Sequence, residues 1–332
     1  MTELLDFSSL GSEDEGISEP ITGTLIPVAP PGFRSGFMAL IGRPNVGKST
    51  LLNALVGQKV AITSPVAQTT RNRLQGILTL AEAQIILVDT PGIHKPHHRL
   101  GEILVENAQA TFYAVDAIVF VVDGSVAAGR GDAYIAERIP AQVPTLICCN
   151  KSDLLGGEVS MLADLPYRYQ DSYHELLPQA DLVSVSALNP DSLTPLLAKM
   201  QALLPSGPYY YPPDLVTDQP ERFIMGELIR EQILLNTREE IPHSVAVTVD
   251  QVEESPTLTR VLATITVERE SQKAILIGKK GDMLKTIGHN ARLQMQKLVA
   301  GKIYLELFVR VRPHWRRSPG LLKDLGYRIE SE

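Results

Sequence analysis

The sequence has few cysteines and no long apolar run, and both shortages exclude classes of protein. Its two cysteines, Cys148 and Cys149, are adjacent and therefore cannot form a disulfide framework. The longest apolar run, residues 117–122, is far shorter than the roughly 18 residues that a membrane-spanning helix needs. Residues 13–15 are acidic and no basic, apolar signal segment accompanies them, so no targeting peptide is expected. We therefore expect a cytoplasmic protein whose cysteines are core residues.

Basic residues are scarce over most of the chain, but their distribution is uneven. Overall, 31 Lys+Arg face 38 Asp+Glu, which gives a formal net charge of −7. From residue 271 to residue 332 the balance reverses, with 13 Lys+Arg against 5 Asp+Glu. A basic end on an acidic body is typical of a nucleic-acid-binding protein, and a solvated basic face explains the charge equally well. Charge alone leaves both interpretations open.

The length of 332 residues predicts two domains, and the apolar pattern predicts where the first one lies. Residues 1–35 lack periodicity and are rich in Gly, Ser, Pro and acidic residues, which is typical of a disordered acidic arm. Residues 36–204 contain short apolar runs separated by helix-length segments, at 37–41, 84–88, 118–122 and 145–149. This spacing predicts an α/β domain with a mostly parallel sheet and helices on both faces.

A second domain is expected after a stiff, Pro-rich linker at residues 205–218. Residues 219–320 show helical spacing or strand-like alternation in the segments 221–236, 245–249, 261–267, 284–298 and 303–311. We interpret the order of elements as α-β-β-α-α-β, a compact α+β module. Residues 321–332 are expected to form a C-terminal tail.

The segment from Gly42 to Ser49 matches the P-loop pattern G-x-x-x-x-G-K-[ST] between a predicted strand and a predicted helix. Its glycines let backbone N–H groups turn toward phosphate oxygens, and the helix N-terminus adds its dipole. We expect Lys48 to hold the β- and γ-phosphates and the Ser49 hydroxyl to ligate Mg²⁺. The residues expected to bind the phosphates are Gly42, Arg43, Pro44, Asn45, Val46, Gly47, Lys48, Ser49 and Thr50.

The choice of guanine over adenine depends on Asp153, which follows the apolar run at 145–149. A carboxylate there accepts hydrogen bonds from the N1–H and the exocyclic amine of guanine, whereas adenine would leave it unpaired. Asn150 and Lys151 are expected to brace the loop and cover the base. The last base-binding loop, where a backbone N–H meets guanine O6, is expected at Ser186, Ala187 and Leu188. The predicted nucleotides are therefore GTP and GDP.

Two motifs between these loops predict a metal site. Asp89 is expected to reach Mg²⁺ through water, and the Gly92 N–H to sense the γ-phosphate; Thr90 and Pro91 complete that motif. Upstream, Thr70 is favoured over Thr69 as the hydroxyl that completes the Mg²⁺ shell. Together the motifs resemble a translation-factor-type GTPase without circular permutation. The predicted metal ligands are Ser49, Thr70 and Asp89, and the predicted catalytic residues are Lys48, Thr70, Gly92 and Asn45.

One departure concerns hydrolysis. Ile93 follows Gly92, where Ras-like proteins carry the glutamine that orients the attacking water, so we expect slow unaided hydrolysis. Asn45 resembles the asparagine with which potassium-activated GTPases hold a K⁺ ion, and we favour that role over a loop-bracing amide. His94, His97 and His98 are interpreted as part of a solvated switch loop rather than a metal cluster.

The basic end contains a G-x-x-G loop, which in KH domains clamps the backbone of about four nucleotides. The loop is formed by Gly278, Lys279, Lys280 and Gly281, and we place it between a strand at 275–277 and a helix. Its lysines supply countercharge for phosphates. Apolar side chains around it, at Ile275, Ile277 and Ile287, either shape the base-binding groove or belong to the core. For Trp315 an anchoring role is favoured over stacking on a base.

The two motif sets in one chain resemble the Era family of bacterial ribosome-assembly GTPases over residues 36–326. The resemblance implies a type II KH domain that binds the 3′ end of small-subunit ribosomal RNA and assists assembly of the small ribosomal subunit. It also implies Mg²⁺, gating of RNA binding by the GTPase domain, and peripheral contact with the inner face of the cell membrane. The acidic arm departs from the short N-terminus usual in that family. We expect a monomer.

Two other functions remain as alternatives. A tRNA-modifying GTPase shares the P-loop asparagine, but it needs a folate- or flavin-linked domain for which no residues remain. A passive RNA-binding scaffold with an inactive nucleotide site is opposed by the intact Lys48, Ser49 and Asp89.

Overall fold

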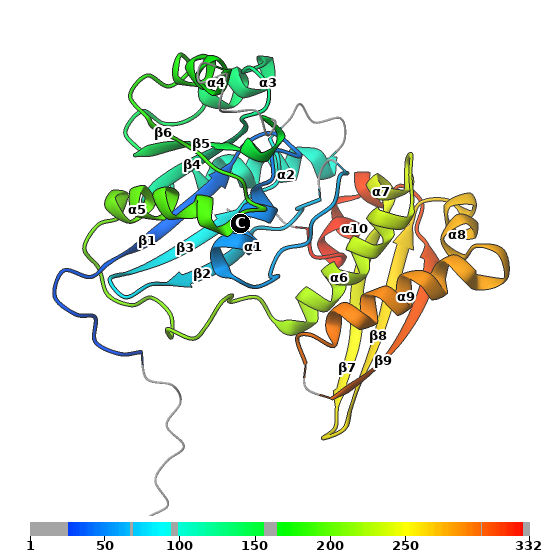
Figure 1. Ribbon diagram of the computed structural model, residues 1–332. Coiled ribbons are helices and arrows are strands. Elements are labelled where there is room, and N and C mark those ends of the chain that lie inside the picture. Colours follow the sequence, from blue (N-terminus) through cyan, green and yellow to red (C-terminus); the bar gives the residue numbers. More distant parts are fainter. Residues whose placement is uncertain (1–25, 67–68, 94–98, 156–164, 300, 328–332) are drawn as a thin grey trace, which may run out of the picture.

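The chain is described by a computed structural model over residues 26–66, 69–93, 99–155, 165–299 and 301–327. Two domains lie side by side, one running from blue to green and the other from yellow to red in Figure 1. Most of the predicted acidic arm lies outside the described residues. Within the described ranges, no helix combines the length and the apolar character that crossing a membrane requires.

The first domain is built on a six-stranded sheet in the order β2-β3-β1-β4-β5-β6. Adjacent pairs are parallel except β2 with β3, which is antiparallel. Its strands are β1 (Arg34–Ile41), β2 (Leu74–Thr79), β3 (Ala83–Asp89), β4 (Ala117–Asp123), β5 (Thr145–Asn150) and β6 (Asp181–Ser184). The apolar runs predicted β1, β3, β4 and β5, whereas β2 was not predicted, because its apolar residues are fewer and it lies at the sheet edge.

Helices cover both faces of this sheet, which confirms the predicted α/β class. They are α1 (Lys48–Val56), α2 (Arg99–Thr111), α3 (Arg130–Ala136), α4 (Leu165–His174) and α5 (Thr194–Leu203). One core cluster joins α1 and α5 to the sheet, and a second joins α2, α3 and α4 to the other face. Cys148 belongs to the first cluster and Cys149 to the second, because successive strand residues point to opposite faces. Both are buried core residues, as predicted.

The expected boundary at residue 36 is wrong, because β1 begins at Arg34. Phe33 is buried, and its ring lies 4.4 Å from that of Tyr209. The linker contains no helix, and it is packed along the first domain. Its backbone bonds to β1 and β2, and the Gln84 amide binds both Tyr210 and Tyr211. These contacts fix the direction in which the chain leaves the first domain.

The second domain has a three-stranded sheet, β7-β8-β9, in which β7 is antiparallel and β9 parallel to β8. Figure 1 shows α6 and α9 lying across it, and their apolar residues share one core with the strands. The predicted order α-β-β-α-α-β is matched by α6, β7, β8, α8, α9 and β9, and the structure adds the short helices α7 and α10. The elements are α6 (Glu221–Asn236), α7 (Ile241–Ser244), β7 (Ala246–Glu254), β8 (Leu258–Val267), α8 (Glu270–Ile277), α9 (Asp282–Met295), β9 (Lys302–Val311) and α10 (Pro319–Asp324).

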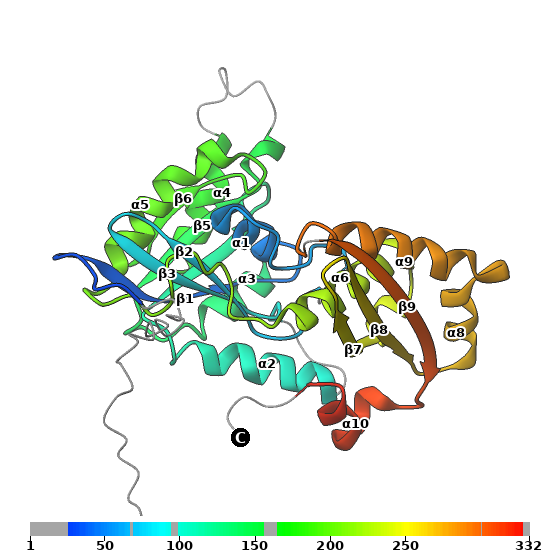
Figure 2. The ribbon, with the colours of Figure 1, turned by 90° about the horizontal axis from the view of Figure 1, so that it is seen from below.

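Two expectations for this domain are wrong. Residues 275–277 are not a strand but the end of α8, whose first turn is closed by Gln272 accepting from the N–H groups of Glu268 and Arg269. The expected tail from residue 321 is folded as far as Tyr327. There Leu322 and Tyr327 are buried against Trp315 and the apolar face of α2, which lies beside α10 in Figure 2. The C-terminal segment therefore joins the two domains.

Candidate nucleotide site and nucleic-acid interface

Two glycines, one in the P-loop and one packed against it, occupy positions where a Cβ would clash. Gly47 has φ +98°, and a Cβ there would lie 2.3 Å from the amide nitrogen of Asn150. Gly92 packs so closely on the loop that a Cβ would lie 2.8 Å from the backbone nitrogen of Pro44. The Lys48 ammonium, inside the loop, donates to the carbonyls of Gly42 at 3.1 Å and Arg43 at 3.0 Å. The P-loop therefore surrounds the Lys48 ammonium and holds it where it can bind a phosphate anion.

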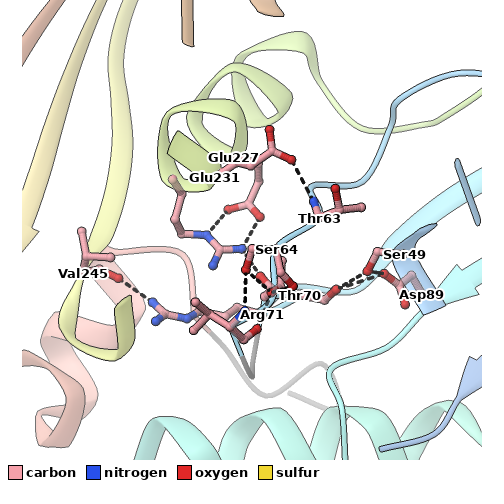
Figure 3. Close-up of polar contacts among 12 residues, drawn as sticks. Ser49, Thr63, Ser64, Thr70, Arg71, Asp89, Glu227, Glu231 and Val245 are labelled. Atoms are coloured by element: carbon pink, nitrogen blue, oxygen red, sulfur yellow. Dashed lines mark hydrogen bonds and ion pairs between the residues drawn. The ribbon is translucent and has the colours of Figure 1, made fainter. Parts of the chain in front are cut away.

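Three oxygen-bearing side chains converge beside this lysine (Figure 3). The Ser49 Oγ lies 2.6 Å from Asp89 Oδ2 and 2.8 Å from Thr70 Oγ1, which in turn donates to Asp89 Oδ2 at 3.0 Å. Asp89 is fully buried and its other oxygen, Oδ1, has no hydrogen-bond partner. A buried, unpaired carboxylate oxygen among hydroxyls is the donor set that a hard cation such as Mg²⁺ prefers. The residues therefore fit a magnesium ion.

The electrostatics of the site reflect its burial. Burial raises the pKa of Asp89, against the opposing effect of Lys48 and of hydrogen bonds from Ser49 and Thr70. Burial lowers the pKa of Lys48 to about 8, and the Asp89 charge opposes that shift. Both shifts mean that the charged forms lack solvation, which phosphate oxygens and a cation would supply.

The structure distinguishes the two adjacent threonines, Thr69 and Thr70, of residues 63–71, the switch segment between α1 and β2. Thr70 points to Ser49 and Asp89, whereas the Thr69 hydroxyl contacts Ser64 Oγ at 2.8 Å and donates to the Val66 carbonyl at 2.6 Å. Thr70 is therefore the hydroxyl within reach of the metal donors. Thr69 instead closes a turn in its own segment.

The residues expected around the base form one network. The Asn150 amide donates to the Val46 carbonyl and accepts from the Ala187 N–H, each at 2.9 Å, so it ties the P-loop to the last loop. Lys151, with φ +66°, donates to Asp123 at 2.7 Å. The Ser186 hydroxyl holds Asp153 at 2.5 Å. Leu188 is exposed beside it.

Two further side chains are those that the sequence singles out for an expected effect on hydrolysis, Ile93 and Asn45. Ile93 is buried in the core between the sheet and α2, so it does not face the phosphate end of the loop. Asn45 is exposed, has φ +64°, and its Nδ2 donates to the Pro65 carbonyl of the switch segment at 2.9 Å. This contact is compatible with both interpretations of Asn45. His94, His97 and His98 lie outside the described residues.

The G-x-x-G loop joins α8 to α9 as a turn in which three of the four residues have positive φ. Gly278, Lys280 and Gly281 have φ of +73°, +55° and +83°. A Cβ at Gly278 would lie 2.7 Å from Met283 Cβ, so only glycine fits there. Both Lys279 and Lys280 are exposed. The turn therefore presents the ammonium groups of two lysines next to two glycines, whose main chain is not covered by a side chain.

The apolar neighbours of the loop divide between surface and core. Ile275 is 50% exposed on α8, whereas Ile287 is fully buried, so Ile275 is available to a ligand and Ile287 belongs to the core. Trp315 is buried and its Nε1 donates to the Ser244 carbonyl at 3.0 Å. The anchoring interpretation of Trp315 is confirmed.

Sequence reasoning missed the charged residues that connect the two domains. Arg71 donates to the carbonyls of Val245 and Pro242, at 2.5 Å and 2.9 Å. Arg230 and Glu231 on α6 bind the switch segment. Their only signal in the sequence is a pair of charges on a helix whose neighbours are apolar, which also describes any partly exposed helix.

Comparison with known proteins agrees with both halves of this description. A family model described as 50S ribosome-binding GTPase matches residues 37–151, and one described as KH domain matches residues 240–316. GTPase Era of Rippkaea orientalis is 61% identical over 312 residues, which are 92% of this chain and 96% of that protein. The chain belongs to the Era family. GTPase Era of Nostoc sp. is 58% identical over 99% of this chain and 100% of its own length.

Two solved Era structures are similar along almost their entire length. One is an Aquifex aeolicus Era variant bound to GDP and aluminium fluoride, and the other is Era with MgGDPNP and nucleotides 1506–1542 of 16S ribosomal RNA. Each has a TM-score of 0.84 and 38% identity, and covers 89% of this chain and 99% of its own. Membership of the Era family makes this chain a GTPase with a C-terminal KH domain.

Proposed function

We propose that this chain is a Mg²⁺-dependent GTPase switch that binds the 3′ region of small-subunit ribosomal RNA and assists small-subunit assembly. The observation that carries the proposal is the donor set of Ser49, Thr70 and Asp89 next to Lys48, in one chain with a basic G-x-x-G turn. Support for the RNA comes from the Era structure that holds nucleotides 1506–1542 of 16S ribosomal RNA.

The residues of the site divide the work of phosphoryl transfer. When bound, Mg²⁺ neutralises charge that develops on the phosphate oxygens; Ser49, Thr70 and Asp89 would hold it, Asp89 through water. Lys48 exchanges the carbonyls of Gly42 and Arg43 for phosphate oxygens. The Gly92 N–H donates to the γ-phosphate, which its close approach to Pro44 allows. Ile93 orients no water from the core, so unaided hydrolysis is slow.

Stimulation by K⁺ is part of the proposal. Asn45 has its Nδ2 committed to the Pro65 carbonyl, so its Oδ1 is the atom that would ligate a monovalent cation. A cation there stabilises the charge that an arginine finger stabilises in other GTPases. Because the same side chain holds the switch segment, the cation site would form only when that segment is closed.

The KH domain supplies the RNA contacts. The turn of Gly278 and Gly281 allows phosphates to approach the main chain, and Lys279 and Lys280 add countercharge. Ile275, exposed on the preceding helix, would contact an unstacked base. A cytoplasmic location with peripheral contact at the inner face of the membrane, and a monomeric state, stay predictions from the sequence.

The test measures hydrolysis and RNA binding on the same preparation. Single-turnover GTP hydrolysis is expected to require Mg²⁺ and Lys48. An RNA oligonucleotide with the 3′ sequence of 16S ribosomal RNA is expected to bind with different affinity in the presence of GDP and of a non-hydrolysable GTP analogue. Linkage requires the nucleotides to respond to RNA by the same factor, about 5- to 150-fold for ordinary coupling energies. Equal RNA affinity in both states would leave two independent modules and disprove the switch.

A further inference from the structure

The switch segment that carries Thr70 is attached to the KH domain at both of its ends (Figure 3). At its start, the Thr63 N–H donates to Glu231 Oε1 at 2.9 Å. Near its end, the Arg230 guanidinium donates to the Thr69 carbonyl. Arg230 and Glu231 are neighbours on α6, so one helix of the RNA-binding domain holds two main-chain groups of the segment.

Both α6 side chains are buried and form ion pairs. Arg230 is 1% exposed and pairs bidentately with Glu227, with its Nε 2.8 Å from Oε1 and a terminal nitrogen 2.5 Å from Oε2. Glu231 is 2% exposed and pairs with Lys59 at 2.5 Å. Buried charges are costly unless they are paired and hydrogen-bonded. Because Lys59, Thr63 and Thr69 belong to the GTPase domain, this network is complete only when the domains are docked.

The contacts fix the position of Thr70 directly. The Thr69 carbonyl belongs to the peptide bond that leads into Thr70, so the bond from Arg230 restrains the Thr70 backbone. On the other side, Arg71 is bound to the KH carbonyls of Val245 and Pro242. Thr70 is therefore held between two residues anchored on the KH domain, with its hydroxyl toward Ser49 and Asp89.

We propose that Arg230 and Glu231 of the KH domain are positioning residues for the GTPase site, which keep Thr70 where it completes the Mg²⁺ shell. This inference rests on the metal role proposed for Thr70. A switch segment is ordered by γ-phosphate and Mg²⁺ and released in the GDP state. Docking of α6 therefore stabilises the GTP complex and leaves the GDP complex unaffected. By linkage, GTP stabilises the docked arrangement by the same factor.

The experiment compares two nucleotides across matched variants of the full chain. Dissociation constants are measured for fluorescent GDP and a fluorescent, non-hydrolysable GTP analogue with Mg²⁺, in Arg230→Gln, Glu231→Gln and the reference Thr70→Ala. The control is Arg222→Gln on the same helix, because Arg222 donates to the Val249 carbonyl at 2.9 Å inside the KH domain. The first three variants are expected to bind the analogue about 5- to 20-fold more weakly with GDP affinity unchanged; the control is expected to change neither.

A second measurement reports on the protein without nucleotide. Hydrogen–deuterium exchange is followed in peptides that cover residues 60–74. Exchange there is expected to be faster in Arg230→Gln and Glu231→Gln and unchanged in Arg222→Gln. Should Arg230→Gln fail to fold, Arg230→Lys serves in its place, since it keeps a charge for Glu227 but cannot bind both partners as a guanidinium does.

The outcomes separate this inference from the proposed site. If Thr70→Ala discriminates between the nucleotides and the two α6 variants do not, the positioning role is wrong and the metal site stands. If the α6 variants weaken both nucleotides equally, their effect is on overall stability and the inference is overturned. If Thr70→Ala itself does not discriminate, the metal role of Thr70 fails and takes the inference with it.

Discussion

The phosphate-binding end of the nucleotide site carries buried charged groups, whereas the charged groups of the RNA clamp are exposed. Lys48 is 6% exposed and Asp89 is fully buried, and both are bonded to their neighbours without any ligand. Lys279 and Lys280 stand in solvent on a turn shaped by two glycines. A buried site is preorganised at the cost of tying function to stability. An exposed clamp depends on backbone shape and countercharge, so its residues can be changed without disturbing the fold.

The largest effect is therefore expected at the clamp. Replacing Lys279 and Lys280 by Asp should lower RNA affinity by about 100-fold or more, because two attractive phosphate contacts become repulsive. GTP affinity without RNA should be unchanged. Lys302→Asp with Lys323→Asp makes the same change of charge elsewhere on the KH domain and is the control. Fluorescence anisotropy with a labelled RNA measures the affinity of each double variant. An equal loss of RNA affinity in both would mean that net charge, and not the turn, binds RNA.

At the base-binding end of the nucleotide site, where Asp153 is exposed, Asp153→Asn tests a single contact with guanine. The variant should weaken GTP binding by roughly 2–4 kcal/mol, because a bidentate, charge-assisted contact is lost. It should also admit xanthosine triphosphate, to which the new amide can donate. Ser186, which holds Asp153, keeps a partner in the amide oxygen, so the loop should retain its shape. Calorimetric titration with GTP and with xanthosine triphosphate measures the change of preference. Unaltered GTP affinity would refute the role of Asp153 in binding guanine.

A further prediction concerns the boundary between the two kinds of region, where Asn45 is exposed yet bonded to Pro65. If Asn45 holds a cation, replacing Na⁺ by K⁺ at constant ionic strength should raise kcat several-fold. Asn45→Ala should remove the difference between the salts. A variant that is slower by the same factor in both salts would identify Asn45 as a brace for the switch segment alone.

The same contrast explains what sequence reasoning could reach. The P-loop follows β1, Asp89 ends β3 and Asp153 follows β5, so the pattern of buried strands places all three at the carboxyl edge of the parallel sheet. The G-x-x-G turn was found, but the helix before it was taken for a strand, because Ile275 and Ile277 flank Leu276 in a run that fits either structure. Of those three, only Leu276 is fully buried. The burial of these side chains, and not their composition, distinguishes the helix from a strand.

The contacts between domains were out of reach for a different reason. Arg230 and Thr69 are 161 positions apart, and no motif spans such a separation. The folded end at Leu322 and Tyr327 likewise depends on α2 as a surface to pack against. Local patterns report on elements and on loops between them, whereas docking depends on surfaces that exist only after each domain has folded.

The smallest expected effect lies in this docked region, at His243 on α7. Burial, together with the charges of Arg71 and Arg316, lowers the pKa of His243 below its ordinary value of 6.5. The folded chain therefore binds fewer protons than the unfolded chain as the pH falls below about 6.5, so stability is lost as the pH is lowered through this range and is regained as the pH rises. Removing the titrating group by His243→Gln should make the thermal unfolding midpoint fall less between pH 7.5 and pH 5.5 than it does in the unaltered protein. Differential scanning fluorimetry measures both slopes, and parallel curves would mean that His243 is protonated equally easily in the folded and unfolded chains.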